Sequence, residues 1–257
     1  MTSSAPSFWK DRFKASGIHL GISLVLAVLA GALVFGLWYP YPYREISGGR
    51  ELFLLLVSVD VVLGPLITLA IFDRRKPGRE LIRDLTFVGL IQLAALGYGL
   101  WSVFVARPVY LVFEYSRFVV VHAVDVPLDM LGQAPANLQS LPLMGPKLLS
   151  LRPFKDNNEK VNATLAALQG ATLSARPDFW QSYAAGTADV LQNAKPVTGL
   201  KSRFPTWVVA IDSTLAATGR KPDTLVYVPM IGRKSYWTVF LDPISAEVVG
   251  FMPLDSF

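Results

Sequence analysis

Three long stretches that are almost free of charge constrain this chain more than any other feature. Residues 15–43 contain no Asp, Glu, Lys or Arg, residues 52–72 contain only Asp60, and residues 85–106 contain none. A helix needs about 20 residues to cross the hydrocarbon core of a bilayer, so each stretch can span a membrane. We therefore predict a transmembrane region at residues 17–106, with helices at about 17–38, 52–72 and 85–106, and a water-soluble domain at 107–257.

The basic residues beside these stretches predict the orientation, because short loops rich in Lys and Arg stay in the cytoplasm. The connection between the first two spans carries only Arg44 and Arg50, which Glu45 and Glu51 offset. The other two flanking segments are strongly basic: Lys10, Arg12 and Lys14 precede the first span, and Arg74, Arg75, Lys76, Arg79 and Arg83 follow the second. We expect residues 1–16 to be cytoplasmic and the C-terminal domain to be periplasmic, in a bacterial inner membrane.

The first apolar stretch has two interpretations. A basic start and the small residues Ala30-Gly31-Ala32 are typical of a cleaved signal peptide. The apolar run continues beyond that site to Trp38, which favours a retained helix. Tyr39, Tyr41 and Tyr43 follow, and with Trp38 they predict an aromatic belt at the outer membrane interface.

The second stretch contains the candidate site of the membrane region. A carboxyl near the middle of a span costs about 2.5 to 3.5 kcal/mol on insertion scales, so Asp60 needs a partner. Gly64, Pro65 and Thr68 follow one to two turns later, and the third stretch supplies Gln92 at a comparable depth. One interpretation is a hydrogen bond from Gln92 to Asp60 that clamps two spans together. The other is a partner-binding face at which a helix of another protein docks on these five residues.

The composition argues against several classes of function. The chain has no cysteine and two histidines, His19 and His122, so it lacks thiolate nucleophiles and the ligands of common zinc sites. From residue 107 onward the chain contains 14 Lys or Arg and 12 Asp or Glu, so its charge is nearly balanced and does not predict a basic surface for a nucleic acid. His122 is expected to be a half-buried strand residue, although a Ser-His-Asp triad is not excluded by spacing alone. We expect no catalytic residues, metal or cofactor, and no enzyme.

The C-terminal domain shows alternating strand and helix signals. Residues 109–113 and 118–124 predict a hairpin, and 207–211, 225–231, 236–241 and 247–251 predict further strands. Residues 158–168 predict a helix capped by Asn157 or Asn158, residues 177–194 predict a second helix, and 127–153 are expected to be a loop. Because strands precede and follow the helices, the predicted class is a membrane protein whose three transmembrane α-helices lead into an α+β periplasmic domain with an antiparallel sheet.

Two motifs resemble a known family. They are Asp60-Val-Val-Leu-Gly-Pro-Leu-Ile-Thr-Leu and Ala106-Arg-Pro-Val-Tyr-Leu-Val-Phe-Glu-Tyr-Ser-Arg-Phe-Val-Val-Val, separated by the basic loop. Over residues 8–124, and more loosely over the last thirty, the chain resembles the type IV pilin accessory proteins of the TfpX/TfpZ type; residues 128–201 match no motif. The resemblance implies a chaperone-like inner-membrane factor that helps a type IV pilin to be assembled into surface pili, with the pilin, the assembly machinery and the bilayer as partners.

Two other classes of function give contrasting expectations. A membrane-anchored periplasmic sensor normally passes its signal to a cytoplasmic output domain, whereas the segments expected inside are a short tail and a dozen-residue loop. A periplasmic hydrolase needs clustered acids, a nucleophile with its base, or metal ligands, and the sequence shows no such cluster. An accessory role in pilus assembly fits both observations.

Overall fold

The computed structural model describes residues 5–221 and 224–257, which form two compact units. The first unit runs to Trp38 and resumes at Gly49–Val105. The second consists of Tyr39–Gly48 and Ala106–Phe257. The second unit therefore includes the short connection between the first two long helices as well as all residues from Ala106 onward.

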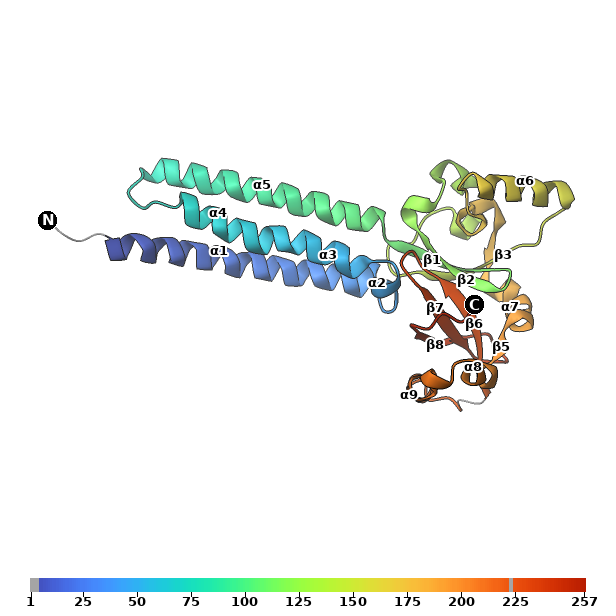
Figure 1. The fold of residues 1–257 in the computed structure, drawn as a ribbon. Helices are drawn as coiled ribbons and strands as arrows, with labels where there is room; N and C mark the ends of the chain where they lie inside the picture. The colour runs from blue at the N-terminus through green and yellow to red at the C-terminus, as the bar shows by residue number, and fades with distance from the viewer. Residues whose placement is uncertain (1–4, 222–223) are drawn as a thin grey trace. The chain divides into compact units, whose positions relative to one another are not determined.

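The first unit contains three long helices that run side by side (Figure 1). The first is α1 (Ala5–Leu33), which ends in the π-helical turn η1 (Val34–Trp38). The second combines α3 (Gly49–Ser58), the π-helical turn η2 (Val59–Leu63) and α4 (Gly64–Ile71), and the third is α5 (Gly78–Val105). The candidate membrane spans Trp9–Trp38, Gly49–Ile71 and Gly78–Val105 measure 30, 23 and 28 residues. The prediction of three long apolar helices is confirmed.

The π-helical turn η2 is explained by the proline that follows it. Pro65 has no N–H to donate to the carbonyl of Val61, and its ring crowds that carbonyl. The helix widens over Val59–Leu63, immediately before the proline, and resumes regular α geometry in α4. Single π-turns of this kind occur frequently at functional sites. Asp60, the only acidic residue of this stretch, lies in the widened turn.

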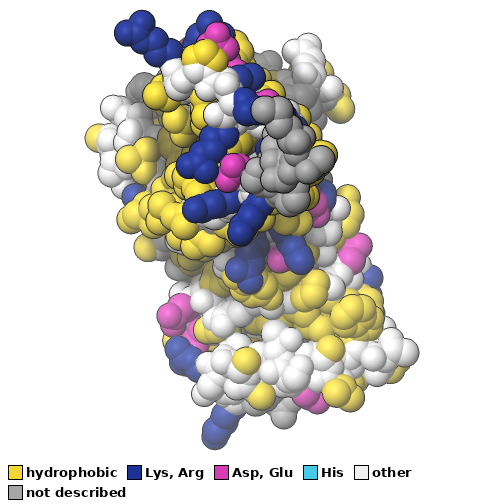
Figure 2. Space-filling view, turned by 90° about the vertical axis from the view of Figure 1, so that its left-hand side faces the viewer, with side chains coloured by type: hydrophobic (Ala, Val, Ile, Leu, Met, Phe, Trp, Pro, Cys, Tyr) yellow, Lys and Arg dark blue, Asp and Glu magenta, His cyan; other side chains and the backbone are white. Residues whose placement is uncertain are grey.

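Ion pairs hold the basic end of the first unit. Arg74 lies 3.3 Å from Asp11 of α1, and Lys76 lies 2.8 Å from Asp84 of α5. Figure 2 faces the end of the helices that carries the N-terminus, and it shows Lys and Arg side chains gathered there. The basic residues that are separate in the sequence thus lie at one end of this unit.

The second unit is built on a mixed sheet of eight strands in the order β4-β3-β1-β2-β6-β7-β8, with β5 beside β6. The strands are β1 (Pro108–Glu114), β2 (Arg117–His122), β3 (Lys147–Leu151), β4 (Trp180–Ser182), β5 (Lys195–Pro196), β6 (Val226–Ile231), β7 (Tyr236–Leu241) and β8 (Val248–Met252). The predicted hairpin and C-terminal meander are confirmed. The pairs β1–β3 and β2–β6 are parallel, so the sheet is not wholly antiparallel.

Helices and a short segment cover both faces of this sheet. Because strand side chains alternate between faces, Tyr227 and Phe240 pack on α8 (Val197–Arg203) and α9 (Val208–Ala216), with Leu200 and Ile211 at 0% exposure. Val228 and its neighbours on the other face pack against α7 (Thr187–Asn193) and α2 (Tyr43–Ile46). The predicted α+β class is confirmed, and a hydrophobic core lies on each face of the sheet.

Four local predictions meet different outcomes. The helix expected at 158–168 is confirmed as α6 (Asn157–Leu168), although its N-cap is Asp156, whose carboxylate accepts the N–H of Glu159. The continuous helix expected at 177–194 is wrong, because the strand β4 interrupts it; short 3-10 turns flank β4, and α7 is the α-helical part. Residues 207–211 are helical rather than a strand, since α9 begins at Val208. The loop expected at 127–153 contains β3.

The segment Tyr39–Gly48 corrects the predicted aromatic belt. Tyr39 is 0% exposed and Ile46 is 0% exposed, and both belong to the second unit. Tyr43 packs in the same core cluster as Trp237 and Val239 of β7. Only Tyr41 keeps a largely exposed ring. The three tyrosines alternate between buried and exposed positions because Tyr39 and Tyr43 fill the core of a folded domain. An amphipathic ring suits such a core as well as it suits a membrane interface.

Candidate functional site

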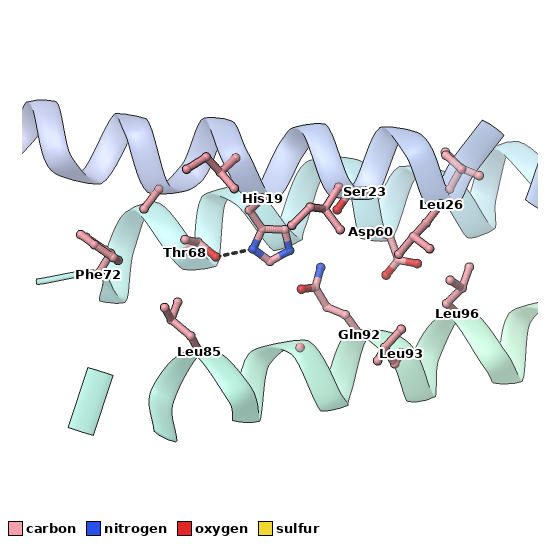
Figure 3. A pocket seen from close by; sticks show the side chains of 16 residues that line it. His19, Ser23, Leu26, Asp60, Thr68, Phe72, Leu85, Gln92, Leu93 and Leu96 are labelled. Carbon is pink, nitrogen blue, oxygen red and sulfur yellow. Dashed lines mark hydrogen bonds between the residues drawn. The ribbon is translucent and has the colours of Figure 1, made fainter. Parts of the chain in front are cut away.

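The first unit contains a cavity of about 460 Å³ between its three long helices. Apolar side chains such as Ile22, Leu26 and Leu96 make most of its wall. Five polar residues also line it: His19, Ser23, Asp60, Thr68 and Gln92. Figure 3 shows these side chains converging from α1, from the helix that contains η2 and α4, and from α5. A mainly apolar cavity with a few convergent polar groups is the usual form of a binding site.

Two hydrogen bonds tie α1 to α4 on one side of this cavity. His19 Nδ1 lies 2.6 Å from Thr68 Oγ1, as the dashed line in Figure 3 marks. One turn earlier, Ser16 Oγ donates to the carbonyl oxygen of Pro65 at 2.8 Å. Thr68 is 2% exposed, so its hydroxyl depends on this partner. The two bonds fix the position of the His19 ring at the cavity wall.

One carboxylate oxygen of Asp60 is buried at the cavity without a hydrogen-bond partner in the described chain. Its Oδ1 atom is buried and accepts no hydrogen bond from any residue that the structure describes. The hydrogen bond from Gln92 that sequence reasoning offered as a structural clamp is not formed within the described chain. An unpaired carboxyl in a membrane span is costly, and such residues mark interaction or transport sites. The carboxyl of Asp60 therefore lies at the cavity in need of a hydrogen-bond donor.

At Gly64, side chains of the two other long helices come close to the backbone of this span. A methyl group at its Cα would overlap the side-chain amide of Gln92 from α5, and would lie 2.9 Å from His19 Nε2 of α1. Glycine is needed here because of this close approach, which is the usual reason for a small residue between membrane helices. Gly64 therefore sets the spacing of the cavity's polar side chains.

The structure brings three of the five predicted site residues to one cavity: Asp60, Thr68 and Gln92. Gly64 lies directly beneath the Gln92 amide, and Pro65 contributes its carbonyl to Ser16 rather than a wall of the cavity. Sequence reasoning missed Ser16, His19 and Ser23 on α1. A usable signal was present, because His19 is the one ionisable side chain between residues 15 and 38 and lies within a predicted membrane span.

No cluster of side chains suited to hold a metal ion occurs in the described part of the second unit. No group of three or more His, Cys, Asp or Glu side chains gathers within residues 5–221 and 224–257. His122 is 1% exposed, so it is more deeply buried than the half-buried position expected from the sequence. Its Nδ1 lies 3.3 Å from Asp125 Oδ2.

The fold and the cavity together define a class: a protein with three helices long enough to cross a membrane, a polar site among them, and a folded α+β domain. Comparison with known proteins narrows this class. The profile of the family described as fimbrial assembly protein FimB matches residues 7–48. No solved structure matches the chain.

Several relatives are fimbrial assembly proteins of Dichelobacter nodosus. The serogroup I protein is 32% identical over 254 residues, which cover 96% of this chain and 98% of the relative. The serogroup E1 protein is 31% identical over the same length, and the serogroup C1 and C2 protein is 41% identical over 129 residues, 49% of this chain and 98% of the relative. The chain belongs to the fimbrial assembly protein family, which confirms the resemblance to pilus accessory proteins.

The match to the family profile covers residues of both units. Residues 7–48 contain most of α1, including Ser16, His19 and Ser23 of the cavity wall. They also contain the segment Tyr39–Gly48, which belongs to the second unit. The matched region thus includes one wall of the membrane cavity and one piece of the domain core.

Proposed function

We propose that this protein is an inner-membrane accessory factor that assists the assembly of a type IV pilin into surface pili. Full-length relatives that carry the name fimbrial assembly protein support this proposal. The proposed partners are the pilin and the pilus assembly machinery, within a lipid bilayer.

The proposed orientation has residues 1–16 and the loop after α4 in the cytoplasm, and residues 107–257 in the periplasm. Its support is the basic end of the first unit, because positive loops are retained in the cytoplasm. With three spans, the second unit lies on the opposite side of the membrane from the N-terminus. A partner with both a membrane helix and a periplasmic head can then contact both units.

The membrane cavity is the proposed docking site for the apolar helix of the pilin. The observation that carries this proposal is the buried, unpaired Oδ1 of Asp60 in an apolar wall. A docking helix gains a hydrogen bond there if it presents a donor at this depth. Thr68 and Gln92 contribute polar side chains to the wall of the cavity. Gly64, which has no side chain, and the π-turn before Pro65 determine the shape of the cavity. Contact is transient in this proposal, because the pilin must leave for the fibre.

Asp60→Leu tests the docking site. Removing an intramembrane carboxyl relieves an insertion cost, so the variant should be as abundant as the native protein while surface pili decline. Ser102→Leu is the matched control, because Ser102 lies exposed on α5 and outside the cavity lining. Normal pilus display by an abundant Asp60→Leu protein would exclude the docking role.

Photocrosslinking separates docking from an effect on the fold. A photoreactive residue in place of Val57, which lines the cavity, should capture the pilin helix. The same residue in place of Val62, which is exposed outside the cavity lining, should capture lipid or nothing. Capture of the pilin equally from both positions would refute docking in the cavity.

A further inference from the structure

A second cavity, of about 280 Å³, lies in the second unit at the end of β2. Its walls come from β2, from the segment around η6 (Leu173–Ala175), and from the turn after β6. Thr172 and Arg233 are exposed at its rim, whereas His122 and Ser174 are each 1% exposed. The cavity therefore connects solvent with polar side chains that are otherwise fully buried.

Two buried polar atoms at this cavity have no partner within the described chain. They are Nε2 of His122 and Oγ of Ser174. A buried polar atom without a hydrogen bond destabilises the fold relative to a satisfied one. Of the buried polar atoms without a partner in the described part of the second unit, these two lie at the same cavity. Both atoms are therefore placed to receive hydrogen bonds from an occupant.

The chemistry of the occupant follows from the state of His122. Asp125 Oδ2 lies 3.3 Å from Nδ1, which favours the tautomer with the proton on Nδ1 and leaves Nε2 as an acceptor. Burial lowers the pKa of His122, so the ring is neutral near pH 7. The occupant must then offer an N–H or O–H to Nε2, while the hydroxyl of Ser174 can donate or accept.

The strand pairing at this cavity points to a polypeptide. The strand β6 runs parallel to β2 but pairs only with Phe118 and Val119, and it ends at Ile231. Val120–His122 continue past that end with no strand beside them on that side. In an antiparallel pair, alternate residues direct their N–H and C=O groups away from the partner strand. At least one residue of this end of β2 thus offers backbone groups to an added chain.

An ion pair bridges two segments at the rim of the cavity. Arg233 in the turn after β6 donates to both oxygens of Asp125, at 2.9 and 3.0 Å. Asp125 lies in η3 (Ala123–Asp125), directly after β2. The pair links the chain that leaves β6 with the chain that leaves β2. The positions of these two segments at the rim are therefore fixed relative to each other.

We propose that this cavity binds an extended polypeptide segment of a partner protein, which lies along the end of β2 and donates a main-chain N–H to His122 Nε2. Strand addition of this kind uses main-chain hydrogen bonds for affinity and adjoining pockets for specificity. The hydroxyl of Ser174 pairs with the segment's next polar group. This inference does not depend on the membrane cavity, and its partner need not be the pilin.

Panning a random heptapeptide library on the full-length protein in nanodiscs tests the proposal. Enriched peptides should bind the native protein and lose affinity on the order of tenfold on Thr172→Trp, which closes the rim. Thr164→Trp is the control, because Thr164 is exposed on α6 outside the cavity lining. Failure to enrich peptides, or equal binding to both variants, overturns the proposal and leaves the cavity to water.

Histidine-labelled protein supplies a second measurement that does not depend on a variant. The chain has two histidines, so its ¹⁵N-histidine spectrum reports His122 with His19 as an internal reference. A recovered peptide should shift the Nε2 signal of His122 and leave His19 unchanged. Methylating the main-chain nitrogen that donates to His122 should weaken binding about three- to tenfold. A shift at His19 alone, or insensitivity to methylation at every position, contradicts the proposed contact.

Discussion

The burial of Ile46 predicts that the connection between the first two long helices stabilises the second unit. Ile46 is 0% exposed and packs in the cluster that contains Trp237 and Val239. Its carbonyl accepts the N–H of Lys234 at 3.0 Å. Gly232 approaches so closely that a methyl group there would overlap the Ile46 side chain. The side chain therefore fills a site with no room to spare.

Ile46→Ala should destabilise the second unit by about 2–5 kcal/mol, the cost of truncating a fully buried aliphatic side chain. A domain is stable by about 5–15 kcal/mol in total, so this is a large share. Ile244→Ala is the matched control: Ile244 belongs to the same unit and is 88% exposed, and its truncation should stay within about 0.5 kcal/mol.

Thiol labelling in urea measures this difference, since the chain has no cysteine of its own. A single cysteine in place of the buried Val239 becomes reactive only on unfolding. With a urea dependence of about 2 kcal/mol per molar, Ile46→Ala should lower the midpoint by roughly 1–2.5 M. Equal midpoints for Ile46→Ala and Ile244→Ala would refute the reasoning. A fragment that starts at Arg107 lacks Ile46 and should be less stable than one that also carries residues 39–48.

Three further predictions concern topology, acid stability and helix spacing. A reporter that is active only in the periplasm should be active after Phe257 and silent at Lys76; activity at Lys76 would reverse the orientation. Hydrogen bonds from Arg152 hold the pKa of Glu159 at about 2, below its usual 4.5, so the stability that they provide is present above pH 4.5 and lost towards pH 2; Glu159→Gln should flatten this part of an acid unfolding curve. Gly64→Ala should lower the melting temperature of the purified protein only modestly, by less than the about 1–3 kcal/mol typical of overpacking would cause, because the atoms that a methyl group would meet are the ends of the Gln92 and His19 side chains, which can move aside; a severe loss of stability would contradict this reasoning.

The membrane region could be predicted largely from the sequence, because its signals are local. A run of apolar residues specifies a spanning helix wherever it occurs, and the three helices lie where the runs predict. Asp60, Thr68 and Gln92 reach one cavity because helical spacing and comparable depth bring them together. The contribution of α1 was not predictable in the same way. Nothing in the spacing of His19 shows which helix face it occupies, and its bond to Thr68 depends on how two helices pack.

In the second unit, secondary structure was predicted correctly where local sequence signals agreed, and wrongly where tertiary contacts determined it. The residues of β1 and β2 favour strands and are joined by a two-residue turn, so local preference and pairing coincide. Phe179 and Trp180 were expected in a helix, but Trp180 pairs across to Leu151 as part of β4. The strand β3 is itself short, and it pairs in parallel with β1 from a region rich in turn residues. Short parallel strands are hard to predict from sequence, because the strands that they pair with lie far away along the chain.

The segment Tyr39–Gly48 shows most clearly where sequence reasoning ends. Aromatic residues after an apolar helix indicate a membrane interface, and the same residues suit a domain core, because each ring combines a large apolar surface with one polar atom. Residues almost two hundred positions later decide between an interface and a domain core. Trp237 packs in the same core cluster as Tyr43, and Gly232 has no side chain, which leaves space for Ile46. The segment is bounded by Trp38 and Gly49, which end and begin membrane helices. Three chain connections rather than one therefore join the two units, and the match to the family profile, which ends at residue 48, includes the first of them.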